Sequence, residues 1–253
     1  MELAIKQYLI QHYLYLASTP STNEFPTNVS SISNPNTNYC IYTYNQTEGR
    51  GQIGRKWYTG ADQNLASSFY FKVYNLDAKD QFLINMMTCL AIYKLIKSYL
   101  PNEPVSIKWP NDMYIGDKKL AGILIQNQIK GNKISHTTIG IGVNINSLEF
   151  PEDIPNPVSL NHYIRDEKGI NKLEFLHALS KNLSDGMNFM ILRDMKKEYT
   201  SKLYRLNETH SYRSAEDGLF EGRILDISQD GKLRMDTPRG IQEYAFREVN
   251  YII

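Results

Sequence analysis

Residues 46–68 read QTEGRGQIGRKWYTGADQNLASS, and within them glycines alternate with arginines ahead of Trp57. Glycine lets the backbone approach a ligand closely, and a neighbouring arginine can bind phosphate or carboxylate through paired hydrogen bonds. The indole of Trp57 offers a flat face on which a base can stack. This stretch therefore predicts a site for an anionic, nucleotide-bearing ligand.

The segment from Gly49 to Gly54 also matches the pattern G-x-G-x-x-G. A dinucleotide site needs a helix that begins inside this motif and an acidic residue after a second strand. Here a turn-like TGADQN follows, and then the alternating pattern of a strand. The context excludes a Rossmann site, and a P-loop is excluded because the sequence lacks G-x-x-x-x-G-K-[ST].

Composition limits the class of protein. The 253 residues are 42% hydrophobic and 22% charged, with a formal net charge of +1, which is typical of a globular enzyme and gives no general basic field for nucleic acid. Cys40 and Cys89 are too few for a disulfide framework or a zinc site. The sequence shows neither a signal peptide nor a membrane-spanning run. We expect a cytoplasmic protein without nucleic-acid or membrane partners.

Hydrophobic periodicity predicts a strand-rich first part and two helical regions. The segment Lys79–Leu100 has apolar residues at helical spacing and ends before Pro101, and Lys172–Tyr204 is expected to be helical with a break or bend near Gly186. Alternation and turn residues predict strands at Leu9–Leu16, Tyr39–Tyr44, Asn64–Tyr74, Val105–Trp109, Asp112–Ile115, Lys119–Gln128 and Ile134–Ile145.

From His210 onward the sequence consists of short runs in which apolar and polar residues alternate, and turn residues separate these runs. The runs are Phe220–Ile227, Lys232–Thr237 and Ile241–Phe246. They predict a small all-β module in the size range of an SH3-like barrel. We therefore expect a first domain at residues 1–205 and a second at residues 206–253.

Three further motifs can carry chemistry. In Lys108-Trp109-Pro110-Asn111-Asp112 a lysine ends a strand before a proline-fixed bend, so it either neutralises a phosphate or carboxylate or is an ordinary exposed strand end. The run KKLAGIL enters an apolar strand with one glycine, Gly122, inside it. The run GIGVNIN holds Gly140 and Gly142, which either make room for a ligand or let two strands pack closely.

The order of these motifs resembles the biotin protein ligases over almost the whole chain. The matching segments are STN at 21–23, Q-x-x-G-R-G at 46–51, GRKW at 54–57, NL at 64–65, KWPND at 108–112, KKLAGIL at 118–124 and GIGVNIN at 140–146. The resemblance implies an α+β fold, with a mixed β-sheet and flanking helices related to class II aminoacyl-tRNA synthetases and lipoate ligases. A small SH3-like β-barrel domain would follow it.

Two features depart from that family. Many members have GRGR where this chain has Gln52 in place of the last arginine, so one positive charge is missing near the expected phosphate. Glutamine still donates a hydrogen bond, and activity is expected to persist. The STN motif begins at residue 21, so we expect no N-terminal helix-turn-helix of the kind that the bifunctional members carry.

The resemblance implies a two-step reaction in which ATP activates biotin to biotinyl-5′-AMP, and a lysine of a biotin carboxyl carrier protein then accepts the biotinyl group. Mg²⁺ would accompany ATP without a dedicated protein cage, and a homodimer is left open. The implied catalytic residues are Lys108, Arg50 and Arg55. The implied biotin-binding residues are Ser21, Thr22, Asn23, Gln46, Arg50, Gly51, Gln52, Lys108, Gly122 and Gly142. Those implied for ATP are Arg50, Arg55, Trp57, Lys108, Asn111, Lys119 and Asn144.

Three alternatives stay open at this point. A lipoate or octanoyl ligase would use the same fold with a different acid. A biotin-sensing repressor would bind DNA without catalysis, and a third class would bind biotin and nothing more.

Overall fold

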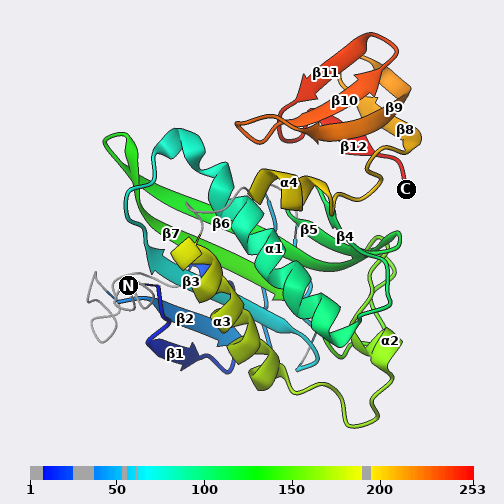
Figure 1. The fold of residues 1–253 in the computed structure, drawn as a ribbon. Helices are drawn as coiled ribbons and strands as arrows, with labels where there is room; N and C mark the ends of the chain where they lie inside the picture. Colours follow the sequence, from blue (N-terminus) through cyan, green and yellow to red (C-terminus); the bar gives the residue numbers. More distant parts are fainter. Residues whose placement is uncertain (1–7, 25–36, 53–55, 61, 190–194) are drawn as a thin grey trace.

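The computed structural model in Figure 1 describes residues 8–24, 37–52, 56–60, 62–189 and 195–253. Two sheets organise these residues, one of seven strands in the order β1-β2-β3-β7-β6-β5-β4 and one of five in the order β11-β10-β9-β8-β12. Within the described residues no helix is long and apolar enough to cross a membrane.

The seven-stranded sheet is mixed because β1 pairs with β2 in parallel, whereas every other neighbouring pair is antiparallel. Each strand corresponds to one of the seven strands expected from the sequence, with its ends shifted by a few residues. The strands are β1 (His12–Tyr15), β2 (Tyr39–Thr43), β3 (Leu65–Lys72), β4 (Val105–Lys108), β5 (Asp112–Ile115), β6 (Lys118–Lys130) and β7 (Lys133–Val143).

Helices α1 (Phe82–Tyr99) and α3 (Lys172–Phe189) lie side by side over one face of this sheet (Figure 1). Their apolar stripes are fully buried, with Ile92 of α1 and Leu179 of α3 both at 0% exposure. The core of the first part of the chain lies between these helices and the sheet. The other helical elements are short: η1 (Thr22–Glu24), η2 (Ala78–Asp80), α2 (Asn161–Ile164) and α4 (Met195–Thr200).

The break or bend expected near Gly186 does not fall at this residue, because α3 continues through it to Phe189. The next described helix, α4, begins at Met195, and residues 190–194 lie outside the described part of the chain. A methyl group at Gly186 would lie 2.7 Å from Sδ of Met87 on α1. Glycine is therefore present because α1 and α3 pack closely at this point, and the contact outweighs its poor helix propensity. The expected helical region also ends early, since α4 stops at Thr200.

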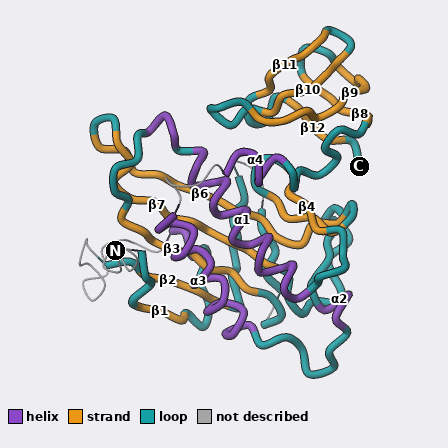
Figure 2. Tube along the Cα trace, in the orientation of Figure 1, coloured by secondary structure: helices purple, strands orange, loops and turns teal. Residues whose placement is uncertain are grey.

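The C-terminal sheet stands apart from the first sheet in Figure 2 and is antiparallel throughout. Its strands are β8 (Thr209–Ser214), β9 (Gly218–Ile227), β10 (Leu233–Thr237), β11 (Gly240–Tyr244) and β12 (Val249–Tyr251). The sequence pattern missed β8 and β12, since β12 has only three residues and β8 is mostly polar. The expected fold class, a mixed α+β sheet followed by a small all-β module, is confirmed. The domain boundary at 205/206 stays a prediction.

Candidate functional site

A row of cross-strand neighbours crosses the first sheet. Lys108 pairs with Asp112, Asp112 with Gly122, Gly122 with Gly142, and Gly142 with Ala66. Directly opposed residues point to the same face of a sheet, so these five share one face. Neighbouring strands are about 4.8 Å apart, which puts Lys108 roughly 14 Å from Gly142. We call this set the glycine row.

The glycine row faces away from the helices. Ile107 and Met113, the next residues along β4 and β5, point to the opposite face and are fully buried in the core beside α1. Because the row contains two adjacent glycines followed by Ala66 at its end on β3, the sheet surface is low along this part. Side chains from other segments can therefore sit directly on the backbone.

Trp57 lies on the middle of the glycine row. A methyl group at Gly142 would overlap its indole, and one at Gly122 would lie 3.1 Å from Cζ3. The Nζ of Lys119 is 5.6 Å from the ring centroid. Among the described residues the buried indole nitrogen has no hydrogen-bond partner. The two glycines thus form a floor under Trp57, and stacking of this ring on adenine stays a prediction.

Four neutral polar side chains gather at one end of the row, and we call them the polar cluster: Thr22, Asn23, Gln46 and Ser68. The Thr22 amide donates to Oε1 of Gln46 over 2.9 Å, and the Ser68 hydroxyl donates to Oγ1 of Thr22 over 2.7 Å. The same hydroxyl contacts Oδ1 of Asn23. Ser21, at 4% exposure, is buried beside the cluster. Hydrogen-bond donors and acceptors from four side chains thus lie close together at this end of the glycine row.

Asn23 owes its position to a third glycine. A methyl group at Gly140 would overlap the Asn23 amide, which also donates to the carbonyl oxygen of Leu124 over 3.4 Å. Gly140 pairs with Ser68 of β3, two residues along the strands from the pair Gly142–Ala66, so both pairs face the same side of the sheet. The polar cluster is therefore seated on the same face as the glycine row.

The other end of the row is charged. Nζ of Lys119 lies 2.8 Å from the Asp112 carboxylate, with both side chains largely buried. Nζ of Lys108 donates to the Tyr114 hydroxyl over 3.1 Å and lies 4.9 Å from the ring centroids of Tyr114 and Tyr251. Two of the predicted cationic side chains are thus brought together here.

The turn that follows Lys108 is held from several directions. The carbonyl oxygen of Pro110 accepts hydrogen bonds from the Tyr199 hydroxyl of α4 and from Nδ2 of Asn85 on α1, both 2.7 Å long. The peptide between Trp109 and Pro110 is cis. Nε1 of Trp109 donates to the carbonyl oxygen of Gly231 over 2.9 Å. Contacts from three separate segments therefore position this turn.

Asn111 and Asn144 are predicted to bind ATP, and the side-chain amide of each donates a hydrogen bond to a backbone carbonyl oxygen. Nδ2 of Asn111 donates to the carbonyl oxygen of Ile123. Nδ2 of Asn144 donates to Val158 over 3.1 Å. Both residues are buried, at 7% and 5% exposure. The bonds fix loops around the glycine row, and direct contact with ATP stays a prediction.

The described part of the glycine-rich loop is held mainly by backbone hydrogen bonds, in which the Thr47 and Glu48 amides donate to Thr19 and Pro20 over 2.9 Å each. Its backbone closes as the Trp57 amide donates to the carbonyl oxygen of Gly49 over 2.8 Å. Arg50 forms an ion pair with Glu24, and its side chain is 58% exposed. Gly51 and Gln52 are half-buried, and Arg55 lies outside the described residues. The roles predicted for all four stay predictions.

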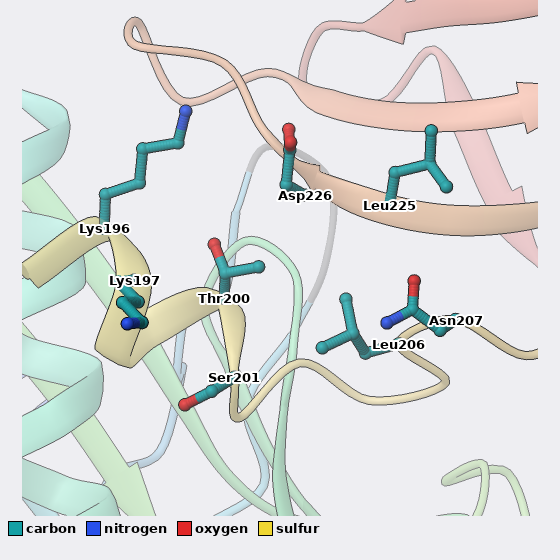
Figure 3. Close-up of a pocket in the computed structure, with 8 residues that line it drawn as sticks. All are labelled: Lys196, Lys197, Thr200, Ser201, Leu206, Asn207, Leu225 and Asp226. Carbon is teal, nitrogen blue, oxygen red and sulfur yellow. The ribbon is translucent and has the colours of Figure 1, made fainter.

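A separate hollow of about 390 Å³ lies between α4 and β9 (Figure 3). It contains none of the predicted site residues and is remote from the glycine row in sequence. Its lining consists of Lys196, Lys197, Thr200, Ser201, Leu206, Asn207, Leu225 and Asp226. In the described part of the chain, no group of three or more His, Cys, Asp or Glu side chains could hold a metal ion.

Sequence reasoning missed several residues at the site. Ser68 pairs with Gly140, and Asp112 pairs with Gly122. Both residues could have been predicted only from the pairing of the strands, which the sequence alone does not give. Tyr114 lies two residues beyond Asp112 on the same face. No local signal marks Tyr251, because its strand has three residues and lies 143 positions after Lys108.

The class of protein is defined by the fold, a mixed sheet covered on one face by two helices, and by the motifs that meet on its other face. Residues 15–144, slightly more than half of the chain, match the model of the biotin/lipoate A/B protein ligase family. The chain therefore belongs to the biotin/lipoate A/B protein ligase family.

Relatives and solved structures agree with this assignment. A bifunctional ligase/repressor BirA of Salmonella typhimurium is 32% identical over 117 residues, which are 46% of this chain and only 36% of that protein. A biotin–[acetyl-CoA-carboxylase] ligase of Paracoccus denitrificans is 27% identical over 216 residues, covering 81% and 86% of the two chains. The biotin protein ligase of Aquifex aeolicus, solved with biotin and ATP, has a TM-score of 0.73 at 23% identity, covering 96% of this chain and all of that one.

Proposed function

We propose that this protein is a biotin–protein ligase that activates biotin with ATP and transfers it to a lysine of a biotin carboxyl carrier protein. One observation carries the proposal: the glycine row connects the polar cluster at one end with Lys108 at the other. An extended acid with a polar head would fit such a path once the Trp57 indole moves off the two glycines on which it lies, and its carboxylate would then reach the lysine. The similarity to ligases solved with biotin and ATP supports it.

In the first step, a carboxylate oxygen of biotin attacks the α-phosphorus of ATP, and the bond to pyrophosphate breaks. Two anions must approach each other, so the main barrier is electrostatic. The ammonium group of Lys108 would sit between the carboxylate and the α-phosphate and stabilise the charge that both share. Lys119, beside Asp112, would lie near the nucleotide, and Arg50 would contribute charge from the loop.

In the second step, the neutral amine of a carrier lysine attacks the acyl carbon of biotinyl-AMP. The amide bond forms, AMP leaves with the electrons of the acyl–oxygen bond, and the amine proton passes to solvent. The enzyme's task here is to exclude water from the mixed anhydride. Trp57, which covers the glycine row, is well placed to do so.

The polar cluster favours biotin over lipoate. The ureido group of biotin carries two N–H donors and a carbonyl acceptor, whereas the dithiolane ring of lipoate has no comparable groups. Thr22, Asn23, Gln46 and Ser68 at present satisfy one another, and each can exchange a partner for a ligand atom. Biotin offers these groups new hydrogen bonds and an apolar ring offers none, so the cluster would bind the ureido head more tightly than the dithiolane ring.

The remaining parts of the proposal concern partners and setting. The carrier would belong to a biotin-dependent carboxylase, as the name of the Paracoccus relative suggests for that protein. Mg²⁺ would arrive with ATP, held by phosphates and water. We place the reaction in the cytoplasm, where ATP is abundant and thiols such as those of Cys40 and Cys89 stay reduced.

The test is a pyrophosphate-release assay with ATP and biotin, followed by addition of a carrier domain and mass spectrometry of that domain. Biotin should release pyrophosphate and add one biotinyl group to a carrier lysine, and lipoate in its place should do neither. Biotin binding without pyrophosphate release would identify a binding protein or a sensor. Modification by lipoate alone would identify a lipoate ligase.

A further inference from the structure

The ammonium group of Lys108 lies between two tyrosines that come from different parts of the chain. Tyr114 belongs to β5, next to β4 in the sheet, and Tyr251 belongs to β12, at the far end of the sequence. Both ring centroids lie 4.9 Å from Nζ, within the range of cation–π attraction. The C-terminal module thus reaches the residue that carries the proposed chemistry.

Tyr251 is itself fixed by aromatic neighbours. Its ring lies 5.3 Å from Tyr212, its partner in the pairing of β12 with β8, and 6.0 Å from Tyr204. Tyr204 in turn lies 5.3 Å from Tyr114 and donates a hydrogen bond to Asp117. Four tyrosines from both sheets and the connecting segment therefore form one packed group, and two of them, Tyr114 and Tyr251, contact the lysine.

The contact of Tyr251 with Lys108 is made by the ring and not by a charged phenolate. Burial raises the pKa of Tyr251 well above its ordinary value, so the phenol is neutral at physiological pH. Among the described residues its hydroxyl has no hydrogen-bond partner. The aromatic ring is thus the part of this side chain that acts on the lysine.

The segment that leads into the C-terminal module, and the module itself, are each secured next to Lys108. Residues 202–204 pair with the outer edge of β4: the Ile107 amide donates to Lys202 over 2.8 Å, and the Tyr204 amide donates to Ile107 over 2.9 Å. Next to Lys108, the Trp109 indole donates to Gly231 and packs against Phe246 at 6.2 Å. The position of Tyr251 relative to Lys108 is therefore defined by its surroundings.

We infer that Tyr251 is a positioning residue, whose ring holds the ammonium group of Lys108 in the place where the carboxylate and the α-phosphate meet. A lysine side chain has many rotamers, and ordering it before the ligands bind lowers the cost of reaching the reactive geometry. The inference rests on the proposed function and adds a task for the C-terminal module. That module completes the adenylating site through one aromatic contact.

The experiment measures the single-turnover rate of biotinyl-AMP formation at saturating biotin and ATP. Tyr251→Leu removes the ring, Tyr251→Phe keeps it, and Tyr244→Leu is the matched control. Tyr244 is equally part of the small module, but it packs on Phe220 and bonds to Asp217, away from Lys108. We expect Tyr251→Leu to lower the rate about tenfold, and Tyr251→Phe and Tyr244→Leu to leave it within about twofold.

A double-mutant comparison separates positioning from a general structural effect. In a Lys108→Ala background the ring has no ammonium group to hold, so adding Tyr251→Leu should change the residual rate by less than twofold. An equal loss with and without Lys108, or an equal loss in Tyr244→Leu, would overturn the inference. A wild-type rate in Tyr251→Leu would overturn it alone, while a wild-type protein that makes no biotinyl-AMP would overturn the proposed function as well.

Discussion

The turn at residues 108–112 and the described part of the glycine-rich loop, residues 46–52 and 56–57, border the same glycine row, but they are built in different ways. The turn is bonded to α1, α4 and the C-terminal module, and the carbonyl oxygen of Pro110 by itself accepts three hydrogen bonds from outside the turn, one of them a weak bond from the Cys89 thiol. In the loop the side-chain ion pair joins Arg50 to Glu24, and both are well exposed. A catalytic charge needs a fixed position, whereas a segment that covers a ligand must be able to rearrange.

The largest effect should come from the charge in the fixed turn. Replacing Lys108 with alanine should reduce biotinyl-AMP formation by about 10²–10³-fold, because one preorganised charge in a site of this kind contributes several kcal/mol to the transition state. Lys118→Ala is the matched control, since Lys118 is exposed two residues before the strand enters the core. Pyrophosphate release measures both, and an unchanged rate in Lys108→Ala would remove the central residue of the mechanism.

The next-largest effect concerns Gly122 and Gly142, the two glycines under Trp57. Gly142→Ala puts a methyl group where the Trp57 indole lies, so the ring must move and the ligand path must narrow. We expect biotin to bind about 30- to 100-fold more weakly by calorimetry, which is about 2–3 kcal/mol. Adding Trp57→Ala should recover stability but not biotin affinity. Recovery of both would mean that the indole alone met the methyl group and that biotin does not pass over Gly142.

A smaller effect is expected from one support of the turn. Tyr199→Phe removes the hydroxyl that donates to Pro110 from a fully buried side chain. Loss of that bond should lower the free energy of unfolding by about 1–1.5 kcal/mol in denaturant titrations. Adenylate formation should fall a few-fold, since Asn85 still holds the same carbonyl oxygen. Tyr58→Phe, at an exposed position, should change neither quantity.

The sequence predicted where the turn at residues 108–112 lies, but not the contacts that hold it in place. The motif order placed Lys108 at the end of a strand, and the strand is there because alternation and the following proline are local signals. The supports of the turn are not local: Tyr199 and Tyr251 contact it from 89 and 143 residues away. No periodicity in the chain encodes such contacts.

The same limit explains the errors elsewhere. Gly186 looks like a helix breaker by propensity, but its role depends on Met87, which lies on another helix. Stacking of Trp57 on a base stays a prediction, but the surface that the ring covers in this structure depends on glycines 65 and 85 residues further along. Strands with a local signal could be predicted from the sequence, whereas contacts between distant segments could not.

The smallest effect should come from the exposed ion pair of the loop. Glu24→Ala removes the carboxylate that Arg50 contacts, and exposed pairs contribute only about 0–1 kcal/mol because solvent screens them. We therefore expect the free energy of unfolding to change by less than about 0.5 kcal/mol. The pair should matter instead for where Arg50 points.

Released from Glu24, Arg50 can turn toward a phosphate, so the Kd for ATP should stay the same or fall by a factor of about 2–3. Arg50→Ala should raise it, and Glu24→Ala combined with Arg50→Ala should match Arg50→Ala alone, because Glu24 would act only through the arginine. Stability matched to wild type together with this pattern would support a loop that exchanges a weak internal pair for a ligand. A loss of stability in Glu24→Ala comparable to that of Tyr199→Phe would mean that the loop is as firmly built as the turn.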